Sequence, residues 1–103
     1  MEYYKDEITQ VLNKIDTTTE LFYQNRQQEG FEALFEIINL LSVIIDKIGK
    51  DQADGHAIPL QTEKLNGILL EALGALEQKD TVLLSDILKY ELVEALEECR
   101  RKL

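Results

Sequence analysis

The sequence predicts an all-α protein, and more specifically an antiparallel, up-down-up-down four-helix bundle made of two helical hairpins. Three observations lead to this prediction. Apolar residues recur at helical spacing in four stretches, short turn-forming segments separate these stretches, and no stretch alternates apolar and polar residues as a half-buried strand does. The chain has 103 residues, which is the size of one ordinary domain, so residues 1–103 are expected to form a single helical unit.

The first helix is expected from about Tyr3 to Gln28. The threonines at 17–19 weaken a helix because they are β-branched. The spacing of Thr17 and Glu20 would even suit a capping box that starts a new helix. The last two threonines keep the phase of the apolar stripe, however, which favours one continuous helix. Gly30 is expected to end it in the left-handed conformation. The stripe consists of Tyr4, Ile8, Val11, Leu12, Ile15 and Phe22.

The second helix, from Phe31 to Ile48, is expected to be the most buried segment and the centre of the core. Its apolar side chains cover more than half of the helix circumference, and only a narrow polar strip is left for water. A surface helix needs an apolar stripe of about 100°, so a wider arc predicts neighbours on at least two sides. The substitutions Ile38→Ala and Ile45→Ala are then each expected to cost about 2–5 kcal/mol.

Gly49 is expected to end the second helix, and the polar, turn-rich residues 50–58 are expected to cross from one hairpin to the next. The third helix is expected at about 60–78. Pro59 would fit its first turn, where a missing N–H has no consequence, and Thr62 is an alternative start. Its core stripe is predicted as Leu65, Ile68, Leu69, Ala72, Leu73 and Leu76.

The fourth helix is expected to begin almost at once, with Asp80 as its N-cap, and to run to about Arg101. The short connection before it, like the one in the first hairpin, predicts antiparallel neighbours. Its core stripe is predicted as Leu84, Leu88, Leu92, Ala95, Leu96 and Cys99.

The charge balance disfavours nucleic acid as a partner. The chain carries 20 acidic and 11 basic residues, a net charge of -9, whereas a protein that binds nucleic acid normally shows a basic patch. The basic residues at 100–102 are explained by a helix C-terminus, where cations face the negative end of the macrodipole.

We expect a cytoplasmic protein without membrane insertion. Cys99 is the only cysteine, so an intrachain disulfide is impossible, which fits a reducing compartment. The sequence does not begin with a charged and then apolar leader. The longest uncharged apolar run, residues 37–45, is about half of the roughly 20 residues that span a bilayer.

No catalytic, cofactor-binding or metal-binding residue is predicted, and the protein is not expected to be an enzyme. A carboxylate-bridged metal pair needs Glu-x-x-His units, but His56 is the only histidine. The loop around it fails as a calcium site because Lys50 and Gln61 would occupy the first and last ligand positions. Cys99 lies on the core stripe, where it is best explained as a small buried side chain. An unrecognised carboxylate site on the glutamate-rich polar faces remains an alternative.

Two features suggest surfaces that bind a partner. The fourth helix carries a second apolar patch in its first turns, where a tyrosine accompanies two branched aliphatic residues, a common interface composition. The third helix carries two glycines that flank a leucine away from the core stripe. Each glycine costs about 1 kcal/mol in a helix, which a close backbone approach would explain. The predicted partner-binding residues are Leu83, Ile87 and Tyr90 of the patch and Leu70, Gly67 and Gly74 of the third helix.

One segment also resembles known sequences. Ala75–Glu98, ALEQKDTVLLSDILKYELVEALEE, combines a Lys-Asp helix junction with the motifs Leu-Leu-Ser-Asp and Tyr-Glu-Leu. It is similar to the C-terminal half of small uncharacterised helical proteins of Gram-positive bacteria, some of which are associated with motility gene neighbourhoods. The resemblance implies a bacterial cytosolic protein without known activity, and it implies no catalytic residue.

The resulting hypothesis is a non-enzymatic protein–protein interaction or structural module. It is expected to self-associate as a homodimer or to dock a helix of another protein. The alternative is a chaperone of the secretion or flagellar-export type, which would bind an amphipathic segment of a client protein.

Overall fold

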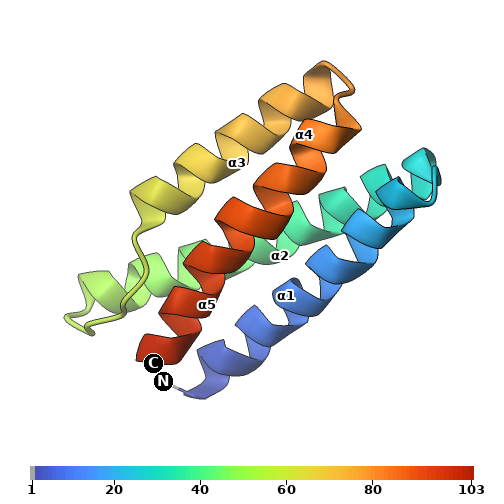
Figure 1. Ribbon diagram of the computed structural model, residues 1–103. Helices are drawn as coiled ribbons and strands as arrows, with labels where there is room; N and C mark the ends of the chain where they lie inside the picture. Colours follow the sequence, from blue (N-terminus) through green and yellow to red (C-terminus); the bar gives the residue numbers. More distant parts are fainter. Residues whose placement is uncertain (1) are drawn as a thin grey trace.

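The computed structural model describes residues 2–103, and these residues form four helices and no strand (Figure 1). The all-α prediction is therefore confirmed. The fourth helix is a continuous run of three segments, which we call α4, η1 and α5. The helices are α1 (Glu2–Tyr23), α2 (Gln27–Ala53), α3 (Thr62–Glu77), and the run of α4 (Thr81–Asp86), η1 (Ile87–Leu92) and α5 (Val93–Lys102).

α1 is continuous through its three threonines, as predicted. Thr18 and Thr19 are both buried, and their hydroxyls donate hydrogen bonds to carbonyl oxygens one turn earlier. The Thr18 hydroxyl bonds to Lys14 O at 2.7 Å, and the Thr19 hydroxyl bonds to Ile15 O at 3.1 Å. Because each hydroxyl finds a partner inside the helix, its burial carries little penalty. The six predicted stripe residues of α1 are all buried.

The connection between α1 and α2 lies earlier than predicted, at residues 24–26. Asn25 takes the left-handed conformation with φ of 62°, which asparagine tolerates better than most residues. The prediction that Gly30 ends the first helix is wrong: Gly30 lies in the first turn of α2 and is buried. A Cβ atom added to it would lie 2.6 Å from Cε1 of the Phe22 ring. The glycine is therefore needed for close contact between the two helices.

Two glycines of α2 should respond in opposite ways to alanine. We expect Gly49→Ala to stabilise the protein by about 0.5–1 kcal/mol, because alanine favours a helix and its Cβ would meet no atom within 4 Å. Gly30→Ala has the same gain in propensity, but it must displace the Phe22 ring, and overpacking costs about 1–3 kcal/mol. Urea denaturation of the two variants measures the difference. Equal stabilisation by both substitutions would show that the close contact at Gly30 is absent.

α2 continues past Gly49, so the predicted helix end there is wrong. The helix runs to Ala53, and the connection to α3 comprises residues 54–61 instead of 50–58. The Gln52 side chain donates hydrogen bonds to Ile58 O at 3.1 Å and to Leu60 O at 3.3 Å. These bonds hold the connection against the end of α2.

α3 begins at Thr62, the alternative start, and Pro59 lies in the connection before it. Its buried residues are Leu65, Ile68, Ala72 and Ala75. The predicted core residue Leu73 is 38% exposed, and Leu69 and Leu76 are half-buried. The helix is thus rotated relative to the predicted stripe, because the alanines face the neighbouring helix and the leucines lie to one side.

The fourth helix begins as predicted and then departs from α-helical geometry. The Asp80 carboxylate accepts a hydrogen bond from Leu83 N at 3.0 Å, which confirms the N-cap. The segment η1 is π-helical, and a π turn inserts one extra residue into the helical repeat. The consecutive residues Ile87 and Leu88 are both buried, because they follow the buried Leu84 by three and four residues and so share its side of the helix.

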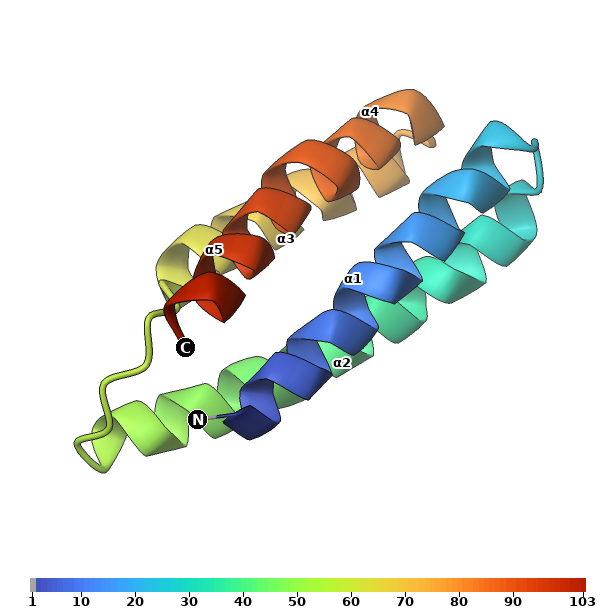
Figure 2. The same cartoon turned by 60° about the horizontal axis from the view of Figure 1, so that its bottom comes forward.

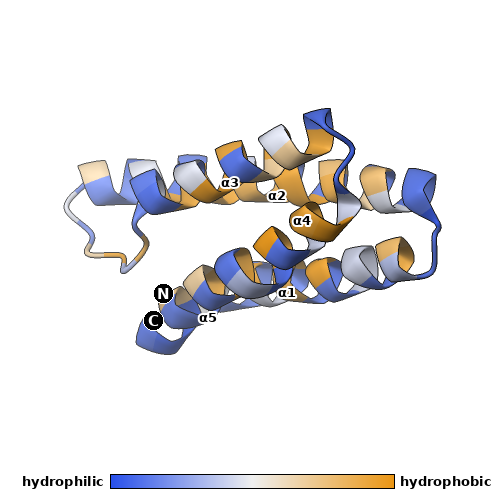
Figure 3. Ribbon diagram, turned by 45° about the horizontal axis from the view of Figure 1, so that its top comes forward, coloured by the Kyte–Doolittle hydropathy of each residue, from blue (hydrophilic) through white to orange (hydrophobic). Residues whose placement is uncertain are grey.

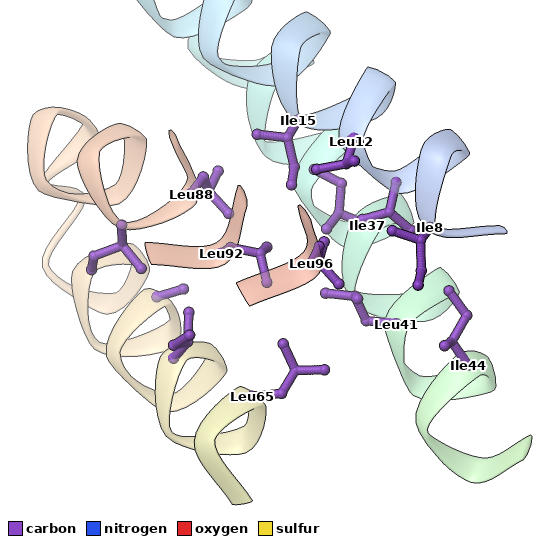
Figure 4. Packing of buried hydrophobic residues seen from close by; sticks show 14 of the residues in the cluster. Ile8, Leu12, Ile15, Ile37, Leu41, Ile44, Leu65, Leu88, Leu92 and Leu96 are labelled. Carbon is purple, nitrogen blue, oxygen red and sulfur yellow. The ribbon is translucent and has the colours of Figure 1, made fainter. Parts of the chain in front are cut away.

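The fourth helix, and not α2, lies at the centre of the core. It packs against both α1 and α3, whereas α2 packs mainly against α1 and only weakly against α3. Figure 2 shows the two pairs, α1 beside α2 and α3 beside the fourth helix. In Figure 4, Leu88, Leu92 and Leu96 lie between the α1 and α2 side chains and Leu65 of α3.

α2 buries only one side of its wide apolar arc, which is why the prediction of a central position was wrong. Ile37 and Leu41 are fully buried, but Ile38 and Ile45 are half-buried. Truncation to alanine is therefore expected to lower the free energy of unfolding by about 2–5 kcal/mol at Ile37 and Leu41, but not at Ile38 and Ile45. Ile38 and Ile45 pack against the edge of the core, and Phe35 beside them is 54% exposed.

Candidate interaction surface

The predicted patch on the fourth helix does not exist as a three-residue surface. Leu83 is 48% exposed and Tyr90 is 63% exposed, but Ile87 is only 3% exposed and belongs to the core. The prediction of Ile87 as a partner-binding residue is therefore wrong. The reason is that Ile87 follows the buried Leu84 by three residues and so lies on the same side of a helix that packs against both α1 and α3.

Tyr90 contacts the end of α1 through a lysine. The Nζ atom of Lys89 lies 5.7 Å from the ring centroid of Tyr23 and 6.0 Å from that of Tyr90. Both tyrosines are exposed, and a cation near two aromatic faces is attracted by both. This contact gives the exposed ring of Tyr90 a partner within the chain.

The glycines of α3 have free space around them. A Cβ atom at Gly67 or Gly74 would meet no atom within 4 Å, so no close backbone approach within the chain explains them. Leu70, which they flank, is 69% exposed. These three predicted residues are thus accessible to a partner.

α2 carries an apolar flank that the sequence analysis assigned to the core. Phe35 is 54% exposed, and its neighbours on the same side of the helix are half-buried. The flank lies opposite α1, because the ion pairs Lys14–Glu36 and Lys47–Glu7 place α1 along the other side of α2. We define the α2 flank as Phe35, Ile38 and Ile45, which lie one and two helical turns apart on one side of the helix. Phe31 packs instead against Phe22 of α1, with the ring centroids 5.3 Å apart in a T-shaped arrangement.

α3 carries a matching flank of leucines. Leu73 is exposed, and Leu69 and Leu76 are half-buried. This flank lies away from the fourth helix, which approaches the other side of α3, where Glu71 lies close to Glu91. We define the α3 flank as Leu69, Leu73 and Leu76.

We call the two flanks together the α2–α3 face. α2 and α3 are in contact. The α2 flank lies on the side of α2 away from α1, and the α3 flank lies on the side of α3 away from the fourth helix. In Figure 3, α2 and α3 lie along the same side of the molecule, and hydrophobic residues are present on both. The wide arc of α2 was the signal for this surface in the sequence, but it predicted a buried centre. Only the position of the fourth helix shows that part of the arc is uncovered.

Cys99 is not activated for chemistry. It is buried in the core, and desolvation raises the pKa of its thiol, an effect that Lys102 only partly opposes. The thiolate is the nucleophilic form, so burial suppresses reactivity. The thiol borders a small pocket of about 120 Å³ next to Leu65 and Lys64.

Across residues 2–103, no three or more His, Cys, Asp and Glu side chains gather where they could hold a metal ion. His56 lies exposed in the connection between α2 and α3. None of the helices in this range is long and apolar enough to cross a membrane.

Glu91 provides a test of the contact between α3 and the fourth helix. Desolvation and the nearby Glu71 raise its pKa in the folded state, so its charged form is disfavoured there and stability falls as the pH rises through that pKa. We expect Glu91→Gln to raise the Tm slightly at pH 7 and to have no such effect below about pH 4. Thermal denaturation at both pH values measures this. An equal Tm gain at both pH values would contradict repulsion between Glu91 and Glu71.

Comparison with known sequences assigns the chain to a family. The family described as a domain of unknown function (DUF8042) matches residues 1–102. The chain belongs to this family. No curated protein and no solved structure matches it. The DUF8042 match includes all four helices, so both the central fourth helix and the α2–α3 face lie within the family domain.

Proposed function

We propose that this DUF8042 chain is a non-enzymatic, cytosolic protein-interaction module that binds a helical segment of another protein through the α2–α3 face. The observation that supports this function is the exposure of apolar side chains on two neighbouring helices. Contiguous exposed apolar surface commonly marks an interaction site. The single cysteine and the acidic composition agree with a cytosolic location.

The proposal includes an antiparallel, up-down-up-down bundle as the scaffold. Contacts between opposite ends of the helices support it. Tyr4, near the start of α1, donates a hydrogen bond to Asp51, near the end of α2. Arg100, near the end of α5, donates to Thr9 of α1 at 3.1 Å. Short connections at 24–26 and 78–80 also favour antiparallel neighbours.

An amphipathic helix is the ligand that suits such a face. When a helix binds a hydrophobic surface, it presents apolar side chains at spacings of three and four residues. The residues of the α2 flank lie one and two helical turns apart, as such a ligand requires. A partner helix lying along α2 and α3 would bury both flanks at once and complete the apolar contacts that the chain leaves open.

Photo-crosslinking in the organism that encodes the chain tests this function. A photoreactive amino acid replaces Phe35 or Leu73 on the face, and Val43 serves as the control. Val43 is a close match because it lies on the same helix and is 52% exposed, against 54% for Phe35. We expect a discrete protein adduct from the two face positions and none from Val43. The absence of adducts at the face would refute an interaction module that uses this surface.

Self-association is the second candidate function, because the same face could pack against that of a second copy in a symmetric dimer. Light scattering at high micromolar concentration tests it. A dimer that Phe35→Glu dissociates and Val43→Glu leaves intact would favour this candidate. A strict monomer would remove it.

A client chaperone, the alternative drawn from the sequence, is a specific form of helix binding. In that case the bound segment would belong to a protein that is exported or assembled later. Co-purification from the native cell distinguishes it: the client should dissociate when Leu73→Glu alters the face. A partner that is already folded and assembled in the complex would argue against a chaperone.

A further inference from the structure

We propose that the partner of the α2–α3 face is an amphipathic helix with basic residues along its edges. This inference rests on the proposed function and specifies the chemistry of the partner. The apolar flanks define where the helix lies, and the charges around them define which helix is preferred.

The charges beside the face are mostly acidic. On α2, Glu32 and Asp46 lie next to the flank, and on α3, Glu63 and Glu77 do so. All four side chains are exposed. Lys50 is the basic residue on the same edge of α2. The edges therefore carry a net negative charge.

These acidic residues are available to a partner. The salt bridges among the described residues involve other carboxylates, Glu36, Glu29, Glu7 and Glu98. Complementary charges around an apolar contact accelerate association and select the partner, and like charges oppose it. A helix with lysine or arginine on both sides of its apolar stripe would meet opposite charges along both edges.

The same charges disfavour a second copy of the chain as the occupant. A symmetric dimer brings the same surface of each copy together, so acidic edge would face acidic edge. Each copy also carries a net charge of -9. An anionic membrane or a nucleic acid is disfavoured for the same reason.

The length of the α2 flank sets the size of the partner segment. From Phe35 to Ile45, a helix rises by about 15 Å at about 1.5 Å per residue. A partner helix of about three turns would cover the flank. Apolar residues at three- and four-residue spacing would contact Phe35 on one side and Leu73 on the other.

Two designed helical peptides of four to five turns test the inference with the full chain. Both carry the same leucine stripe, and the edge residues are lysine in one and glutamate in the other. We expect the lysine peptide to bind at least about tenfold more tightly at low salt. Raising the ionic strength from about 0.05 to about 1 M should remove most of the difference, because salt screens exposed charges. Fluorescence anisotropy of labelled peptide measures both affinities.

Charge reversal on the protein should reverse the preference. The variant Glu32→Lys, Asp46→Lys, Glu77→Lys should bind the glutamate peptide more tightly than the lysine peptide. The control Asp16→Lys, Glu20→Lys, Glu97→Lys changes the net charge equally but alters exposed residues of α1 and α5. It should keep the original preference. If both variants shift the preference equally, the effect is one of net charge, and the inference is wrong.

The possible outcomes separate this inference from the proposed function. Equal binding of both peptides, lost on Phe35→Glu but not on Val43→Glu, would overturn the basic partner and leave helix binding intact. Binding of neither peptide would overturn the inference, and photo-crosslinking at Phe35 would then decide the function by itself. Dimerisation through the face would overturn the inference in favour of a second copy.

Discussion

Ile37→Ala should lower the free energy of unfolding by about 2–5 kcal/mol. Ile37 is 0% exposed and contributes to the cluster around the fourth helix (Figure 4). Removing three carbons from a fully buried isoleucine loses their transfer free energy and leaves a cavity that its neighbours fill only in part. Urea denaturation with linear extrapolation measures the change.

The adjacent residue provides the control for this prediction. Ile38 has the same side chain in the same helix, but it is half-buried and belongs to the α2 flank. Ile38→Ala should therefore cost clearly less than Ile37→Ala. If the two losses are equal, α2 is enclosed on both sides, and both its peripheral position and the exposed α2–α3 face are wrong.

Ser85→Ala should stabilise the protein, although it removes a polar group from the core. Ser85 is 1% exposed, and its hydroxyl has no hydrogen-bond partner within residues 2–103. A buried hydroxyl without a partner costs about 1–3 kcal/mol, and alanine is also the better helix former. We expect the free energy of unfolding to rise by about 1–3 kcal/mol, as measured by thermal and urea denaturation.

Ser42→Ala separates the effect of removing an unpaired buried hydroxyl from the effect of the higher helix propensity of alanine. Ser42 is exposed on α2, so its replacement should give only the propensity gain of about 0.5 kcal/mol. A gain at Ser85 no larger than that at Ser42 would show that the buried hydroxyl does have a partner. The comparison is informative because Ser85 precedes the π-helical segment η1, where the backbone hydrogen bonds change their spacing.

Helices and helix caps could be predicted where a single sequence pattern, such as an apolar stripe or a capping residue, was clear. The stripe of α1 and the N-cap at Asp80 are such cases. Helix ends were less predictable. Gly30 and Gly49 are common end signals in a sequence, but both lie inside α2. At Gly30, the contact with the Phe22 ring decides the outcome.

The candidate surface could be predicted only in part. Leu70 and its flanking glycines are exposed as expected, whereas Ile87 is buried. Ile87 is buried because the fourth helix packs against both α1 and α3, and the apolar pattern of a helix does not show how many neighbours the helix has. The exposed part of the α2 arc was visible in the sequence, but a buried side chain and a binding surface have the same apolar composition.

The sequence by itself determined the all-helical class, the four apolar stretches, the acidic charge and the absence of catalytic residue patterns, because these depend on residue types and short spacings. Only the tertiary structure decided which helix lies at the centre and which apolar side chains remain exposed. The physical reason is that periodicity gives the direction of an apolar side chain on its own helix but not the identity of its neighbour. Whether Phe35 is covered depends on where α3 and the fourth helix pack, and the α2–α3 face follows from that placement.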